Sequence, residues 1–145
     1  MEKEFKGRVV IKGCGTYKAL VTHSGFNTLA SYKNCKKGKN ICTDQNNKEL
    51  YGKSTVGKAL CLPQTIGSTT GGMVLYNASY TSCAPGALLF SKTIDSLAAA
   101  GAILADVWTD NSMPTVDKLG DEFLQYVHDD DEIEIKEDGV VIVRR

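Results

Sequence analysis

The chain has 145 residues, of which 42% are hydrophobic, and its 17 basic and 17 acidic side chains give a formal net charge of zero. This length predicts a single domain over residues 1–145 with enough apolar side chains for a core. The balanced charge gives no electrostatic reason to expect nucleic acid or an anionic membrane as a partner. No apolar run approaches the roughly 18 residues of a membrane span, and the charged start is no signal peptide, so we expect a cytoplasmic protein.

Two β-rich segments open the chain. Gly7–Gly13 and Thr16–Thr22 are both predicted strands, and the short Cys14-Gly15 link predicts that they pair as a hairpin. The segment from Asn27 to Ser54 is irregular and rich in lysine. Its role over residues 33–53 stays open, because the lysines fit either attraction of an anionic substrate or acidic partner, or a solvated loop.

The middle of the chain alternates between apolar strands and helices. Short strands and helix segments are predicted in the order 59–62, 73–76, 87–90 and 97–105. Asp95 or Ser96 can cap the last of these, and its small residues permit close packing. The alternation predicts an α/β fold with a parallel core and right-handed crossovers.

The last third of the chain predicts three further elements. Met113–Val116 reads as a short edge strand, because Pro114 cannot donate to an interior ladder. Residues 121–128 predict two helical turns with Phe123 and Leu124 buried. Residues 132–144 alternate around Glu137-Asp138-Gly139, which predicts a hairpin.

The cysteines do not form a recognisable metal or disulfide pattern. Five are present, with no C-x-x-C pair. This spacing predicts neither a disulfide framework nor a zinc site, and nothing in it indicates an iron–sulfur cluster. Cys61 lies inside an apolar run and is expected to be buried. We therefore predict no metal site in this chain.

The turn Gly67-Ser68-Thr69-Thr70-Gly71 lies between a predicted buried strand and a predicted helix. A strand, a glycine-rich turn and a helix N-terminus together offer free N–H groups and a favourable dipole to an anion. Two interpretations stay open from these residues alone. Ser68 presents a hydroxyl or alkoxide to a carboxylate-bearing substrate, with Gly67, Thr69, Thr70 and Gly71 as its setting, or the turn only caps a helix.

A second strand-to-helix junction is expected at the same edge of the sheet. It contains Ser91, Asp95 and Ser96, which follow the predicted strand 87–90. Open α/β sheets bind ligands outside the carboxyl ends of their strands. The three residues are therefore further substrate-binding candidates, although capping explains Asp95 and Ser96 equally well.

The order of these pieces resembles a known family. The segments that carry the resemblance are Gly7-Arg8-Val9-Val10, Gly57–Pro63, Gly67–Gly71, Ala84–Phe90 and Ile94–Ala102. Together they are similar to the small subunit, or swivelling domain, of aconitase X, over nearly the full length of the chain. The resemblance implies an aconitase-like swivelling β/β/α domain, in which a barrel-like sheet is flanked by helices.

The resemblance also implies a function. Members of the family are hydro-lyases, and the serine of their G-S-x-x-G turn is the proposed catalytic base, a position that Ser68 matches here. It further implies a heterodimer with a large aconitase X subunit, which carries the iron–sulfur cluster and most of the pocket. The chain would then bind no cofactor itself and would be inactive alone.

The substrate is the open point of this resemblance. We prefer cis-3-hydroxy-L-proline, because Ile94–Ala105 and the following Asp106-Val107-Trp108 are similar to bacterial members of that type. Mevalonate 5-phosphate is the alternative, which fits a separate small chain with a lysine-rich loop. A third hypothesis is a module that binds a small anion without chemistry. The chain also has Gln64-Thr65-Ile66 where the family often has Gly or Arg, at a place where substrate is selected.

Overall fold

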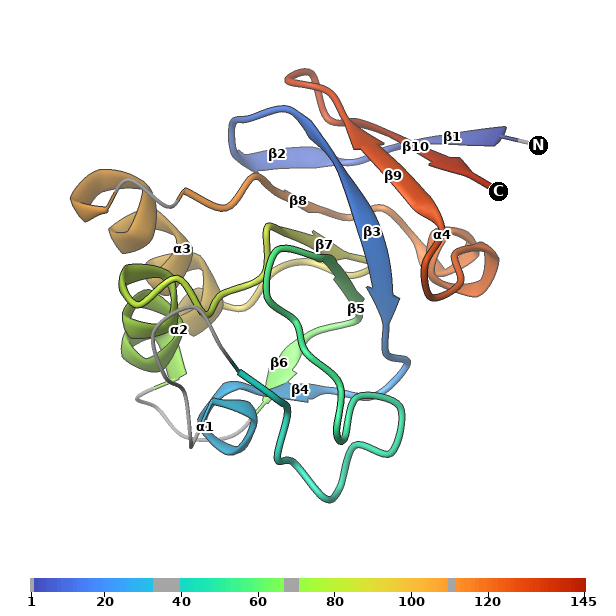
Figure 1. Cartoon of the computed structure of the whole chain (residues 1–145). Coiled ribbons are helices and arrows are strands. Elements are labelled where there is room, and N and C mark those ends of the chain that lie inside the picture. Colours follow the sequence, from blue (N-terminus) through green and yellow to red (C-terminus); the bar gives the residue numbers. More distant parts are fainter. Residues whose placement is uncertain (1, 33–39, 67–70, 110–111) are drawn as a thin grey trace.

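The computed structural model describes residues 2–32, 40–66, 71–109 and 112–145 (Figure 1). The strands of this part are β1 (Glu2–Lys6), β2 (Arg8–Ile11), β3 (Gly15–Val21), β4 (Phe26–Asn27), β5 (Ala59–Leu62), β6 (Thr65–Ile66), β7 (Ala87–Phe90), β8 (Thr115–Asp117), β9 (Glu132–Ile135) and β10 (Val140–Arg144). Its helices are α1 (Thr28–Ser31), α2 (Gly71–Tyr80), α3 (Ser96–Trp108) and α4 (Asp121–Tyr126). None of the described helices is long and apolar enough to cross a membrane.

Eight strands form one sheet in the order β1-β10-β9-β3-β5-β7-β8-β2. The two strands at the ends of this order, β1 and β2, follow one another in the chain with only Gly7 between them. The sheet therefore curls until its ends approach each other, which gives it a barrel-like form. Helices α2 and α3 cover one side, and α4 lies on the other (Figure 1).

The central strands β3, β5, β7 and β8 are parallel, which confirms the predicted parallel core. Both faces of β5 are buried. Ala59 and Cys61 point into the core that α4 closes, whereas Leu60 and Leu62 pack in the core beneath α2 and α3. This double burial is the reason that the strand reads as an unbroken apolar run. The smaller side chains face the barrel interior, where there is less room.

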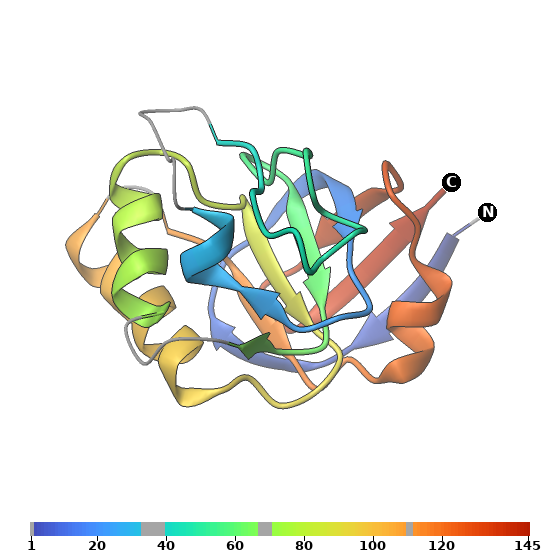
Figure 2. The ribbon, with the colours of Figure 1, turned by 90° about the horizontal axis from the view of Figure 1, so that it is seen from below.

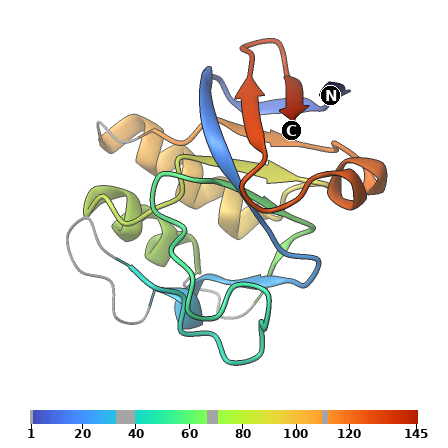
Figure 3. The same ribbon diagram turned by 45° about the vertical axis from the view of Figure 1, so that its right-hand side comes forward.

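The predicted helices agree well with the structure. Asp95 is the N-cap of α3, and its carboxylate accepts from the backbone of Ala98. The buried residues of α3 are all small: Ala98, Gly101, Ala102 and Ala105. In α4, Phe123 and Leu124 are buried as predicted. The final hairpin of β9 and β10 is also confirmed, and Figure 3 shows the two termini close together beside it.

The strand pairings differ from the sequence prediction in three places. β2 and β3 do not form a hairpin, because β2 pairs with β8 and β3 pairs with β5 and β9. β8 is not an edge strand, since it lies between β7 and β2. Pro114 precedes β8 and contributes only its carbonyl, which accepts from the Leu88 N–H, so its missing donor costs nothing there. Strand β1 was not predicted.

The cysteines are partly as expected. Cys61 is fully buried, and this burial raises the pKa of its thiol, so it packs as a small apolar residue. Cys14 is free and exposed, and Cys42 is free and buried. Cys83 is disulfide-bonded, which the cysteine spacing did not predict.

The close packing of Gly7, which joins β1 and β2, against β8 predicts how a substitution there changes the stability of the fold. A Cβ on Gly7 would lie 2.3 Å from the Asp117 carbonyl oxygen and 2.7 Å from Val116 Cγ1, so Gly7→Ala forces β1, β2 and β8 apart. We expect a loss of about 3 kcal/mol in the free energy of unfolding, measured by urea denaturation.

Gly52→Ala is the matched control for this substitution. Gly52 has a φ of +80° but open space around its Cβ position, so only backbone strain of about 1 kcal/mol is expected there. Equal losses in the two variants would contradict a tight closure at Gly7.

Candidate functional site

The parallel strands all end at one edge of the sheet. β3 ends at Val21, β5 at Leu62, β7 at Phe90 and β8 at Asp117. The segments that follow these strands lie next to one another, because Thr22 N–H donates to the Cys61 carbonyl and Ser91 N–H donates to the Leu62 carbonyl. This carboxyl edge is where open α/β sheets bind ligands. Of the predicted site residues, Ser91, Asp95 and Ser96 follow β7 and lie at this edge.

The structure describes the two flanks of the predicted catalytic turn. Gly67, Ser68, Thr69 and Thr70 lie outside the described residues, so their roles remain predictions. The chain enters this turn from β6 and leaves it at Gly71, the first residue of α2. β6 pairs in parallel with β4 as a separate two-stranded sheet at the bottom of the molecule (Figure 2). The sequence around Ser68 is therefore flanked by a strand and a helix N-terminus.

Asp95 connects the two junctions of the carboxyl edge. Its Oδ1 accepts from the Thr65 hydroxyl at 2.5 Å and from the Thr65 N–H at 3.3 Å. Its Oδ2 accepts from the Ala98 N–H at 3.0 Å and so caps α3. Both oxygens of this carboxylate are thus bonded to protein groups.

The two serine candidates have different environments. Ser91 is 4% exposed, and its hydroxyl has no hydrogen-bond partner among the described residues. Its backbone is fixed, since its carbonyl accepts from the Gly120 N–H. Ser96 is exposed in the first turn of α3. A ligand at this edge can reach Ser96 directly, whereas Ser91 lies beneath the surface.

An ion pair between a half-exposed arginine and a buried carboxylate lies at the end of β8. The Asp117 side chain is fully buried and accepts two hydrogen bonds from Arg8, at 2.9 Å from Nε and 2.7 Å from Nη2. These bonds and the charge of Asp117 raise the pKa of Arg8 above its ordinary value. Asp117 also accepts from the Ile94 N–H at 2.8 Å, one residue before Asp95. The pair thus anchors the segment that leads into α3.

Positive charge gathers beside this pair. Lys92 and Lys118 are both exposed, and their backbones are joined by a hydrogen bond from the Lys118 N–H to the Lys92 carbonyl. Since the charge of Arg8 is paired with Asp117, it is the two lysines that make this part of the carboxyl edge attractive to anions.

A hollow of about 410 Å³ lies at the end of β3, lined by Val21, His23, Glu49, Lys53, Val127, His128 and Asp129. Several of its charged groups are paired with one another. Lys53 contacts Asp129 at 2.8 Å, and His23 Nδ1 contacts Glu49 Oε2 at 2.7 Å. His23 Nε2 lies 3.2 Å from the Leu124 carbonyl oxygen, so the imidazole donates on both sides when it is protonated. These contacts fasten the loop after residue 40 to β3 and α4.

The pKa values of this pair are coupled. The hydrogen bond to Glu49 raises the pKa of His23; burial opposes the rise, and the Glu49 charge adds to it. For Glu49, burial acts to raise the pKa, but the hydrogen bonds and charge of His23 outweigh it and the pKa is lowered. His23 is therefore a structural contact.

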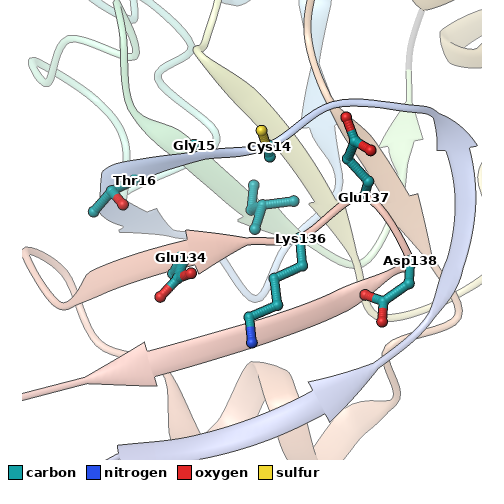
Figure 4. A pocket seen from close by; sticks show the side chains of 8 residues that line it. Cys14, Gly15, Thr16, Glu134, Lys136, Glu137 and Asp138 are labelled. Atoms are coloured by element: carbon teal, nitrogen blue, oxygen red, sulfur yellow. The ribbon is translucent and has the colours of Figure 1, made fainter.

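A second hollow, of about 510 Å³, lies between β3 and the β9–β10 hairpin (Figure 4). It is lined by Cys14, Gly15, Thr16, Glu134, Ile135, Lys136, Glu137 and Asp138. Gly15 is the first residue of β3, so this hollow lies at the amino end of the parallel strands. It faces away from the junctions described above.

The described residues do not offer a metal centre. In residues 2–32, 40–66, 71–109 and 112–145, no group of three or more His, Cys, Asp or Glu side chains could hold an ion. The free thiols of the same segments, at Cys14, Cys42 and Cys61, are not clustered with other ligands. This donor set does not fit an iron–sulfur cluster, which requires several thiolates around one site.

A family model described as the aconitase X swivel domain matches residues 4–143. The chain belongs to the aconitase X swivel domain family. Curated relatives include the phosphomevalonate dehydratase small subunit of Methanosarcina mazei, 29% identical over 90% of this chain and 83% of that protein. The protein of the same name from Methanothrix thermoacetophila is 33% identical over 80% of this chain and 77% of that one.

Solved structures agree with this assignment. The holo-form of Thermococcus kodakaraensis aconitase X has a TM-score of 0.83 at 24% identity and covers 99% of each chain. The solution NMR structure of a UPF0107 protein has a TM-score of 0.81 at 26% identity, covering 99% of this chain and 100% of that one. The expected swivelling β/β/α fold with a barrel-like sheet is thereby confirmed.

Sequence reasoning missed three contributors to the edge of this aconitase X swivel domain. Thr65, Arg8 and Asp117 were not among the predicted site residues, although Arg8 lies in a segment that carried the family resemblance. No local signal distinguishes Asp117 from an exposed loop aspartate, because its partners are at positions 8 and 94.

The His23–Glu49 pair generates a pH prediction. The raised pKa of His23 stabilises the fold fully below its ordinary value of 6.5, and this contribution is lost as the pH rises through the raised pKa. The lowered pKa of Glu49 stabilises the fold above its ordinary value of 4.5. The pair therefore contributes most between these two values.

The measurement compares urea unfolding of the wild type and His23→Gln from pH 5 to 9. Since the two side chains are 53% and 39% exposed, solvent screening limits the expected loss to about 0.5–1 kcal/mol at low pH, fading at alkaline pH. In a Glu49→Gln background the same substitution should have a weaker pH dependence, because only the Leu124 carbonyl and the Asp129 charge then raise the pKa of His23. A loss that grows with pH would contradict this pairing.

Proposed function

We propose that this chain is the small subunit of a heteromeric hydro-lyase that removes water from mevalonate 5-phosphate. The observation that carries the proposal is the family match over residues 4–143, with relatives named phosphomevalonate dehydratase small subunit. The likeness of Ile94–Ala105 to bacterial hydroxyproline-type members favoured cis-3-hydroxy-L-proline, but the named relatives support the alternative. Activity belongs to the complex, so the chain alone is expected to be inactive.

The proposed chemistry assigns Ser68 the role of base. Loss of water from a β-hydroxy acid requires removal of a proton from the carbon next to the carboxylate. A serine is a weak base in water, so its alkoxide must be stabilised by the N–H groups of Gly67–Gly71 and by the N-terminus of α2. Thr69 and Thr70 complete the same turn, and Ser91 and Ser96 remain proposed substrate contacts.

The leaving hydroxyl requires a different group. Because the described donor set does not fit an iron–sulfur cluster, we place the cluster in the large subunit, as the family resemblance implies. Bound there, it would supply a Lewis acid for the departing hydroxyl. This chain contributes the proton-accepting side of the site.

The surface around the turn supports a partner at this position. Ile66, the residue before Gly67, is 49% exposed, and Met73 in the first turn of α2 is 56% exposed. Large apolar side chains on both flanks of a catalytic turn are costly to leave in water, and a large subunit would cover them.

The charge of the edge supports the proposed substrate class. Mevalonate 5-phosphate carries both a carboxylate and a phosphate. The exposed Lys92 and Lys118 at the carboxyl edge favour the approach of such an anion.

Ser68→Ala tests the proposed base. The chain is co-expressed with the large aconitase X subunit of the same organism, and water loss is measured with mevalonate 5-phosphate and with cis-3-hydroxy-L-proline. We expect activity on the phosphate ester, and a fall of about 1,000-fold in kcat in Ser68→Ala without loss of the complex.

The matched control is Ser112→Ala, an exposed serine beyond the far end of α3, which should keep full turnover. Near-normal turnover in Ser68→Ala would contradict the base. Activity on the hydroxyproline alone would contradict the substrate, and failure to form a complex would contradict the subunit assignment.

A further inference from the structure

The contact between Thr65 and Asp95 joins two segments that are thirty residues apart in the chain. The hydroxyl-to-carboxylate distance of 2.5 Å is that of a charge-assisted hydrogen bond, the stronger class in proteins. The backbone N–H of Thr65 donates to the same oxygen at 3.3 Å. The Asp95 carboxylate at the start of α3 thus accepts hydrogen bonds from both the hydroxyl and the backbone N–H of Thr65 in β6.

β6 needs such a contact because its own pairing is small. It contains two residues and, within the part of the chain that the structure describes, pairs only with the two residues of β4, outside the eight-stranded sheet. A two-stranded ladder of this length is not stable by itself. Figure 2 shows β6 between β4 and the start of α3, where Asp95 reaches it.

The residues on both sides of Asp95 are themselves held in place by hydrogen bonds. The preceding residue, Ile94, donates its N–H to the buried Asp117, which Arg8 holds by two hydrogen bonds. The following helix is fixed by the bond from the Ala98 N–H to Asp95 Oδ2. The carboxylate is therefore held in place from both directions before it accepts from Thr65.

We propose that Asp95 is a positioning residue that fixes Thr65 and so holds in place β6, the strand that leads into the predicted Gly67–Gly71 turn. This inference rests on the proposed function, in which that turn carries the base. The three hydrogen bonds that the two oxygens of Asp95 accept all come from protein groups. Asp95 acts on the reaction by holding β6 against α3.

Asp95 also caps α3, and the structure separates this capping role from the contact with Thr65. The cap uses Oδ2, whereas Thr65 uses Oδ1. Asp95→Ser keeps a side chain that caps helices well, but its shorter hydroxyl leaves no second oxygen at the place of Oδ1 to accept from Thr65. Thr65→Val removes the hydroxyl from the other partner and leaves the cap intact.

The test uses Thr65→Val, Thr65→Ser and Asp95→Ser in the complex with the large subunit. A displaced base lowers the rate of the chemical step more than it weakens substrate binding. We therefore expect kcat to fall about 10- to 100-fold in Thr65→Val and Asp95→Ser. KM should stay within about twofold. Thr65→Ser retains the hydroxyl and should restore kcat, which a purely structural loss of packing would not allow.

Two exposed residues supply matched controls. Thr16→Val changes a threonine at the amino end of β3, and Asp121→Ser changes an acidic residue at the start of α4. Both should leave kcat unchanged. If Thr65→Val turns over like Thr16→Val, the proposal is overturned.

Amide hydrogen exchange of residues 64–72 gives a readout that needs neither partner nor substrate. Exchange should accelerate in Thr65→Val and Asp95→Ser, and not in Thr65→Ser. An inactive wild-type complex would overturn the proposed function, and the exchange result would then decide this proposal by itself. Unchanged exchange in both variants would overturn it.

Discussion

The buried carboxylate of Asp117 is the contact on which the carboxyl edge depends. A carboxylate that is buried away from water is costly unless its oxygens accept hydrogen bonds. The oxygens of Asp117 accept them from Arg8 and from the Ile94 N–H. Arg8 comes from β2, Asp117 ends β8, and Ile94 leads into α3. One side chain therefore fixes the last pairing of the sheet and the start of the helix that carries Asp95.

The two cores explain how a sheet of this shape supports such an edge. The barrel interior holds Ala59 and Cys61 of β5 with Ala87 and Leu89 of β7 and is closed by α4, whereas Leu60, Leu62, Leu88 and Phe90 of the same strands pack under α2 and α3. Each parallel strand is thus held on both faces, so its carboxyl end is rigid. The turns that follow these strands begin from fixed points, which suits a site that must meet groups on another polypeptide.

Local patterns predicted much of this fold. The apolar runs of β5 and β7, the Asp95 cap of α3 and the β9–β10 hairpin depend on neighbours in the sequence, and all were found. The pairings of β2 and β8 were missed because their partners are more than 100 residues apart. For the site, sequence placed the candidates at one edge but missed the Thr65 and Asp117 contacts, whose geometry exists only after the chain has folded.

The pairing of β1 with β10 has a consequence for how the chain can be rearranged. Glu2 lies opposite Arg144, and adjacent strands are about 4.8 Å apart, so a linker of a few residues bridges the two ends. Circular permutation, with new ends opened at the exposed turn around Gly52, would keep the barrel pairings in place. A protein fused to either original end would leave the barrel from the same place.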